Sequence, residues 1–159
     1  MFHFKKRNND IAFYACAKGK VIALEDVSDP VFAQKMIGDG IAVIVDDELI
    51  RAPVEGVLTM IAETKHAFGI TTDNGIELLV HIGLETVNLQ GKGFQVLAET
   101  GSKIEKGQPI IALNTSFFKE KHIELVTPIL ILNYTEFPIK KLISSPGNEV
   151  NQNKILFHV

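Results

Sequence analysis

Two histidines and a threonine between residues 64 and 87 are the residues of this sequence best suited to chemistry. The stretch reads "TKHAFGITTDNGIELLVHIGLETV" and contains Thr64, His66 and His81. A neutral imidazole can act as a nucleophile, a base or a metal ligand, and a neighbouring hydroxyl can fix which ring nitrogen carries the proton. These residue types suit nucleophilic catalysis or metal binding, provided that the chain brings them together.

A β-hairpin is predicted to bring the two histidines together. Asn74-Gly75 is a strong signal for a two-residue turn, because both central positions of a type I′ turn need positive φ. The pairing that follows is Asp73 with Ile76, His66 with Gly83 and Phe68 with His81. The two histidines then become diagonal neighbours on one face of the hairpin. A three-residue loop would instead shift the pairing and place them on opposite faces.

Alternation along the second strand predicts which face carries His81. One side is unbroken and apolar: Ile76, Leu78, Val80 and Ile82. The other side holds Glu77, Leu79, His81 and Gly83. Because the apolar side belongs to the core, we expect His81 to face solvent or a shallow pocket, with Thr64 on the same surface.

Short apolar runs rich in valine and isoleucine favour strands in most of the chain. They are "KVIAL", "GIAVIV", "GVLTMI", "IELLVHIGL", "QPIIAL" and "TPILIL", with Gly, Pro, Asn or Asp between them. The sequence therefore predicts an all-β fold, a compact antiparallel β-sandwich or barrel. "ACAKGKVIAL" and "APVEGVLTMI" share Ala-x-x-x-Gly before a strand, which indicates either a duplicated β unit or a chance similarity of turns.

Only two stretches carry helix signals, so the helices are expected to be very short. In "SDPVFAQKMIG", Ser28 or Asp29 can cap a helix that Gly38 can end. In "NTSFFKEKH", Asn114, Thr115 or Ser116 can cap a second one.

Composition narrows the class of protein. The 159 residues fit a single domain over 1–159, and 16 basic against 19 acidic side chains give a net charge of -3, which argues against nucleic-acid binding. The one cysteine, Cys16, cannot form an internal disulfide and is expected to be a small buried hydrophobe in a cytoplasmic protein.

No apolar run approaches the ~20 residues of a spanning helix, so no membrane insertion is expected. Residues 1–10 are expected to be flexible and too short for an amphipathic anchor.

The motifs together resemble a known family, the glucose-type IIA component of the bacterial phosphoenolpyruvate-dependent sugar phosphotransferase system. The resemblance runs from about Gly19 to Asn133. It is carried by "DPVFAQKMIGDGIAV", "APVEG", "TKHAFGI", "GIELLVHIGLETV", "KGF" and a late Thr-Pro followed by Asn133. It implies a β-sandwich, similar to a duplicated hybrid motif, and a phosphotransferase function.

The resemblance also implies roles for the site residues. His81 would accept a phosphoryl group from the phosphohistidine of the carrier HPr. It would pass that group to a cysteine of a IIB domain, which phosphorylates sugar entering through the membrane-spanning IIC domain. His66 would support the phosphorylated state and Thr64 would orient His66. The transfer would require no cofactor and no metal, and the protein would act as a monomer.

A protein that serves two protein partners in turn should offer a shallow apolar rim with charges around it. The candidates are Val31, Phe32, Met36, Ile37, Leu79 and Val87, with Asp29 and Glu85 as acidic edges. The family often has aromatic residues near the site where this chain has Ala62 and Leu79, a difference expected to change partner affinity.

Two alternatives stay open at this stage. His66 and His81 can hold zinc if a carboxylate from Glu77 or from a partner completes the site, so partner-bridged zinc is one candidate. The other is a regulatory docking protein of the same fold without transfer activity. The sugar and the permease served are not encoded in these motifs, because specificity would lie in the IIC domain.

Overall fold

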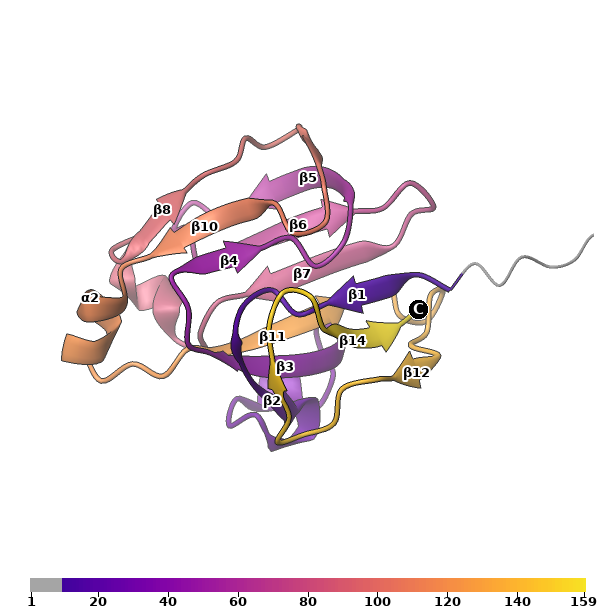
Figure 1. The fold of residues 1–159 in the computed structure, drawn as a ribbon, viewed down its shortest axis with the longest axis horizontal. Coiled ribbons are helices and arrows are strands. Elements are labelled where there is room, and N and C mark those ends of the chain that lie inside the picture. The colour runs from indigo at the N-terminus through magenta and orange to yellow at the C-terminus, as the bar shows by residue number, and fades with distance from the viewer. Residues whose placement is uncertain (1–9) are drawn as a thin grey trace, which may run out of the picture.

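The computed structural model describes residues 10–159, and these form an antiparallel β structure with very short helices (Figure 1). The strands are β1 (Ala12–Tyr14), β2 (Gly19–Ala23), β3 (Asp39–Val45), β4 (Leu49–Arg51), β5 (Gly56–Ile61), β6 (Ala67–Thr71), β7 (Glu77–His81), β8 (Phe94–Val96), β9 (Lys103–Ile104), β10 (Pro109–Leu113), β11 (Val126–Ile131), β12 (Lys141–Leu142), β13 (Glu149–Val150) and β14 (Ile155–His158). The helices are α1 (Pro30–Ala33) and α2 (Thr115–Glu120), with 3-10 turns η1 (Leu24–Asp26) and η2 (Thr86–Leu89). The predicted fold class is confirmed. The flexibility predicted for residues 1–10 concerns a segment that lies, apart from Asp10, outside the described residues.

The strand order has an internal symmetry. One sheet has eight strands in the order β13-β2-β3-β11-β7-β6-β5-β9, and two sheets have three strands each, β1-β14-β12 and β4-β10-β8. Exchanging β2, β3 and β11 with β5, β6 and β7 gives the same order of the six central strands, read from the other edge of the sheet. The two similar segments noted in the sequence enter β2 and β5, which are equivalent positions. The structure thus favours the duplicated β unit over a chance similarity.

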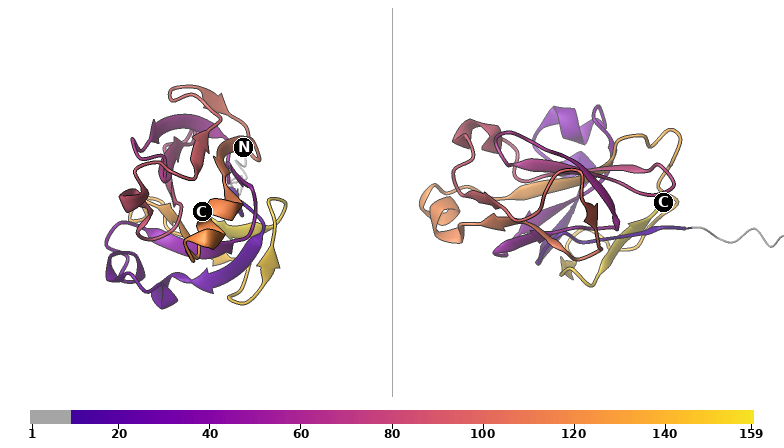
Figure 2. Two further views of the ribbon diagram at one scale, coloured as in Figure 1. Left: turned by 90° about the vertical axis from the view of Figure 1, so that its left-hand side faces the viewer. Right: turned by 90° about the horizontal axis from the view of Figure 1, so that it is seen from above.

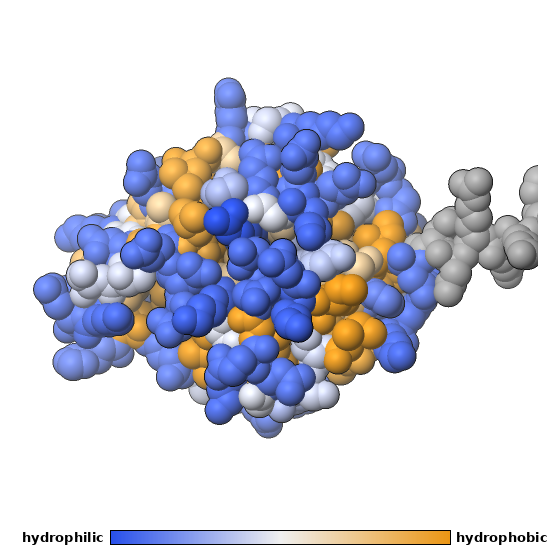
Figure 3. All heavy atoms as spheres, in the orientation of Figure 1, coloured by the Kyte–Doolittle hydropathy of each residue, from blue (hydrophilic) through white to orange (hydrophobic). Residues whose placement is uncertain are grey.

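The main core lies between the long sheet and the two short ones. It includes Phe13 and Phe157 from the sheet of β1, Ile50 and Ile111 from the sheet of β4, and Val80 from β7, all fully buried. The two short sheets lie next to each other along one side of the long sheet (Figures 1 and 2). Their outer surface carries apolar side chains in separate groups between polar ones (Figure 3).

The apolar face predicted for β7 is confirmed, since Ile76, Leu78, Val80 and Ile82 are all buried in this core. The predicted register is wrong. The Thr72 amide donates to Ile76 O, so Asp73, Asn74 and Gly75 form a three-residue loop. Ala67 therefore pairs with His81, and Phe68 pairs with Val80 in the core. Asn133 stabilises the longer loop through its side chain, because Nδ2 donates to Gly75 O and Oδ1 accepts from the Glu77 backbone amide.

Both short helices begin at predicted caps. The Asp29 carboxylate accepts from the Val31 amide with Pro30 at the first helical position, and the Asn114 side chain accepts from the Phe117 amide. α1 ends at Ala33 rather than near Gly38. A small second apolar cluster lies under α1 and η1, on the face of the long sheet opposite the main core; it contains Leu24, Val27, Phe32, Ala42 and Leu130.

Cys16 is fully buried in the main core, as expected, and burial raises the pKa of its thiol to about 12. Within residues 10–159 no helix is long and apolar enough to cross a membrane.

Candidate active site

The two histidines meet on the outer face of the long sheet, next to α1. Their ring centroids lie 4.8 Å apart and the ring planes make an angle of 79°. This contact was predicted, but through a different geometry. His66 lies outside β6, directly after Lys65, whose φ of 63° puts it in the left-handed region. Strand alternation therefore does not extend to His66, and the three-residue loop does not separate the two rings.

A backbone carbonyl determines the tautomer of His81. The Nδ1 atom of His81 lies 2.6 Å from Gly83 O. Because a carbonyl oxygen only accepts, Nδ1 must carry a proton, and in the neutral ring the lone pair is on Nε2. Gly83 turns its carbonyl toward the ring with a φ of 75°, a conformation that favours glycine.

Thr64 lies against the second histidine, as predicted. Its Oγ1 is 2.7 Å from His66 Nδ1. His66 is 8% exposed, whereas His81 is half-buried and has the Phe32 ring 4.9 Å away on one side. The backbone links the segments of the two histidines as well, because the amide of Ile82, the residue after His81, donates to His66 O at 2.6 Å.

Both imidazoles are held in their neutral form. Burial lowers the pKa of His81 below its ordinary value of 6.5, although the hydrogen bond to Gly83 and the charge of Asp29 oppose this shift. Burial and the neighbouring charge of His81 lower the pKa of His66. At neutral pH the site therefore presents an unprotonated Nε2 on His81, which is the form required of a nucleophile.

Most of the apolar side chains predicted for the rim are at least partly accessible. Val31, Met36 and Val87 are 39%, 69% and 48% exposed. Ile37 and Leu79 are half-buried and pack against the cluster under α1. Met60 was not predicted as part of this rim. It is 41% exposed on β5 opposite Gly69, and Gly69 is in turn opposite Leu79, so Met60 continues the same row.

Phe32 lies beneath this rim. Only 3% of its surface is exposed, because the ring packs into the cluster under α1 while touching His81. Phe32 therefore supports the histidine from below, and its accessible surface is too small for a docking contact of its own.

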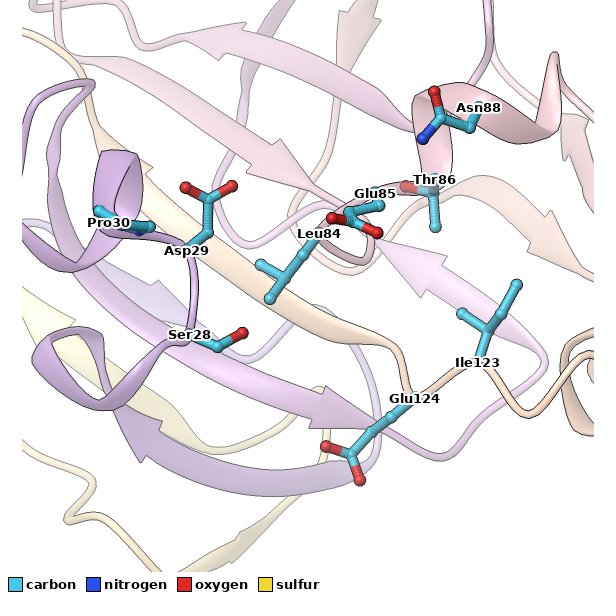
Figure 4. A pocket seen from close by; sticks show the side chains of 9 residues that line it. All are labelled: Ser28, Asp29, Pro30, Leu84, Glu85, Thr86, Asn88, Ile123 and Glu124. Atoms are coloured by element: carbon cyan, nitrogen blue, oxygen red, sulfur yellow. The ribbon is translucent and has the colours of Figure 1, made fainter.

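An open cleft of about 720 Å³ adjoins the site, between the start of α1, the loop after β7 and the segment before β11. The predicted acidic edges Asp29 and Glu85 both line it, together with Glu124 (Figure 4). None of the three forms a salt bridge with another described residue. Glu124 was missed because it is far from the histidine motif in sequence, and no local pattern marks it.

Glu77, which was considered as a zinc ligand together with the two histidines, does not lie near them. Glu77 and His81 are at opposite ends of β7, which at about 3.3 Å per residue separates their backbones by roughly 13 Å. In the described part of the chain, no group of three or more His, Cys, Asp or Glu side chains is arranged to hold a metal ion.

Comparison with known proteins identifies the family of this chain. Residues 11–137 match the family model of the phosphoenolpyruvate-dependent sugar phosphotransferase system, EIIA 1. Glucose-specific EIIA components of this system from Staphylococcus aureus strain Mu50 and Staphylococcus epidermidis are each 42% identical over 129 residues, which cover 81% of this chain and 78% of the relative. The solved structure of glucose permease IIA from Mycoplasma capricolum superposes with a TM-score of 0.86 at 32% identity, covering 99% of both chains. The chain belongs to the EIIA 1 family and is a phosphoryl carrier of the sugar phosphotransferase system.

Proposed function

We propose that His81 accepts the phosphoryl group from the phosphohistidine of HPr and passes it to a cysteine of a IIB domain. The observation that carries this assignment is the bond between His81 Nδ1 and Gly83 O. It leaves Nε2 of a neutral ring as the nucleophile, on a partly exposed side chain at the end of β7. His66 is more buried, and its Nδ1 is engaged by a hydroxyl that can donate or accept.

The transfer balances without a further reactant. The lone pair of His81 Nε2 forms a bond to phosphorus while the bond from phosphorus to the donor imidazole breaks, and that electron pair returns to the donor nitrogen. In the second step a thiolate of the IIB domain attacks phosphorus, and the electron pair of the broken bond returns to His81 Nε2. Such transfers depend mainly on in-line positioning and on stabilising charge on the equatorial oxygens.

His66 is proposed to stabilise that charge. If the Thr64 hydroxyl donates to His66 Nδ1, the proton of the neutral ring is on Nε2. With the two rings 4.8 Å apart, that N–H can donate to an oxygen of a phosphoryl group on His81. Thr64 is thus assigned the role of selecting the tautomer of His66.

The surface around the histidines is proposed as the common docking surface for both partners. It combines exposed Val31, Met36 and Val87 with the acidic cleft of Asp29, Glu85 and Glu124. A partner with an apolar centre and basic side chains at its edge would complement it. We expect the protein to act as a monomer in the cytoplasm, where both partners present their transfer sites.

No cofactor is needed for these steps. A zinc ion bridging His66 and His81 to a partner is a second candidate, and it would need the partner's carboxylate because Glu77 lies at the other end of β7. A regulatory docking role is compatible with phosphoryl transfer. Phosphorylation adds about two negative charges to an already acidic surface, so it would change which partners that surface binds.

The test is incubation with phosphoenolpyruvate, enzyme I and HPr, followed by intact mass and acid-lability measurements. Wild-type protein should gain one acid-labile phosphoryl group, His81→Ala none, and His66→Ala should be phosphorylated but transfer poorly to a IIB domain. His158→Gln, on β14 in another sheet, is the matched control and should behave as wild type. An unmodified wild-type protein, or phosphorylation retained in His81→Ala, would refute the assignment.

A further inference from the structure

Thr86 is a buried polar residue that the transfer mechanism does not use. It is the first residue of η2 and is only 2% exposed. Its hydroxyl donates to Ile82 O, and its methyl group lies directly against Gly83, where an added Cβ would come within 2.5 Å of Thr86 Cγ2. Thr86 therefore contacts both residues that follow His81 in the chain.

These contacts fix the backbone on which the tautomer of His81 depends. The Ile82 amide donates to His66 O, and the Ile82 carbonyl accepts from Thr86. The peptide plane entering Gly83 is therefore held at the carbonyl by Thr86. Rotation about Gly83, with φ of 75°, then places Gly83 O at 2.6 Å from His81 Nδ1. A change in the orientation of the peptide between Ile82 and Gly83 would therefore move Gly83 O, the carbonyl that holds the His81 ring.

We propose that Thr86 is a positioning residue for the phosphoryl-transfer reaction: through Ile82 O and Gly83 its hydroxyl keeps the proton of neutral His81 on Nδ1 and the nucleophilic lone pair on Nε2. This inference rests on the proposed function of His81. Thr86 itself does not touch the reacting atoms. Its effect is on which nitrogen is free to attack, and it acts through the bond between His81 Nδ1 and Gly83 O.

Three variants separate this role from simple packing. Thr86→Val keeps the branched shape and the methyl contact with Gly83 but removes the donor. Thr86→Ser keeps the donor and removes the methyl group. Ser144→Ala is the matched control, because the Ser144 hydroxyl also donates to a backbone carbonyl, Ile155 O at 2.6 Å, but in the sheet of β1, β14 and β12.

The primary readout is the tautomer of His81, measured by nitrogen NMR of the ring without any partner. Wild type and Thr86→Ser should show the proton on Nδ1, whereas Thr86→Val should show a substantial share on Nε2. The rate of phosphorylation by phospho-HPr should fall about tenfold in Thr86→Val, the order expected for losing one oriented hydrogen bond. Ser144→Ala should lose stability without changing the tautomer or the rate.

Each other outcome overturns the proposal. If Thr86→Val keeps the Nδ1 proton and the wild-type rate, the hydroxyl only stabilises the fold. If Thr86→Ser is as impaired as Thr86→Val, the hydroxyl alone does not hold the tautomer, and the packing of the whole side chain is responsible. Should Thr86→Val not fold, Thr86→Ala removes the same donor without a buried apolar substitute and is measured instead. Failure of the proposed function is distinguishable, because it would leave wild-type His81 unphosphorylated whatever its tautomer.

Discussion

His66 and His81 contact each other edge to face, with centroids 4.8 Å apart, although they are not paired across their strands. The residue opposite His81 is Ala67, and the small side chain leaves room for the ring of His66 to approach from outside β6. One ring presents a free nitrogen and the other can present an N–H beside it. This complementarity is what a site that receives and releases a phosphoryl group needs, since the group is attacked at phosphorus while its oxygens are held.

Replacing Thr64 should weaken transfer by releasing the tautomer of His66. Thr64→Val keeps the shape but removes the hydroxyl at 2.7 Å from Nδ1. Transfer from phosphorylated protein to a IIB domain should slow about tenfold, the order of one hydrogen bond, while His81 is still phosphorylated. Rapid-quench measurement of phosphoryl loss checks this, with Thr135→Val, an exposed threonine elsewhere, as control. An unchanged rate in Thr64→Val would remove Thr64 from the mechanism.

The rate of phosphorylation should depend on pH through His81. Because burial lowers the pKa of His81, the neutral nucleophile predominates at neutral pH, and the initial rate should rise with pH with a midpoint below pH 6.5. Asp29 raises the pKa of His81, so Asp29→Asn, which retains a capping side chain, should move the midpoint to lower pH. NMR titration of the His81 ring measures both midpoints. A shift to higher pH in Asp29→Asn would contradict the electrostatic account.

Stability should fall on acidification for the same reason. Both histidines have a lower pKa in the folded protein than the ordinary 6.5 of an exposed imidazole, so the unfolded chain binds protons first. The contribution of the two neutral histidines to the unfolding free energy is present above pH 6.5 and is lost as the pH falls toward their pKa values in the folded protein. Urea unfolding at pH 7.5 and 5.5 should show a smaller loss of unfolding free energy for His66→Gln combined with His81→Gln than for wild type. His158→Gln is the control, and an equal loss in all three proteins would count against the argument.

The sequence was sufficient for the fold class because its signals are local. Alternation in β7 identified the core face, and two capping residues marked both helices, since each depends on neighbours along the chain. The symmetric strand order also agrees with the similar segments that enter β2 and β5.

The details that define the site depend on contacts between distant segments. The loop after β6 has three residues, and Asn133, far away in sequence, bonds Gly75 and Glu77 where the loop joins β7. Glu124 reaches the cleft from the segment before β11, and Phe32 is buried under His81 by residues of β3 and β11. No hydrophobic pattern encodes a carbonyl such as Gly83 O, so the anchor of the nucleophile emerges only from the folded backbone.

The observed register has an energetic consequence at Phe68. It pairs with Val80 and is fully buried, whereas pairing with His81 would have placed it on the outer face. Phe68→Ala should therefore reduce the unfolding free energy by about 3–5 kcal/mol, the usual cost of truncating a buried phenylalanine. Chemical denaturation measures this, and Val57→Ala, at a 39% exposed position on β5, should change stability much less. Similar small losses in both variants would argue for the other register.

The carboxylates of the cleft should act mainly on the rate at which the phosphoryl donor associates. Glu85 and Glu124 are exposed and form no salt bridge with described residues, so their field is available to a basic partner. Glu85→Gln and Glu124→Gln should each slow association with phospho-HPr by roughly two- to fivefold at low salt, because charges at the edge of an interface steer the encounter. The difference from wild type should shrink at high salt, where screening shortens the reach of the field to a few ångströms. Stopped-flow association at two ionic strengths tests this, with Glu136→Gln, an exposed glutamate after β11, as control. If the decrease in association rate for Glu124→Gln did not depend on salt, Glu124 would act by direct contact rather than by steering. If Glu136→Gln slowed association as much, the net charge of the protein rather than the cleft would guide the partner.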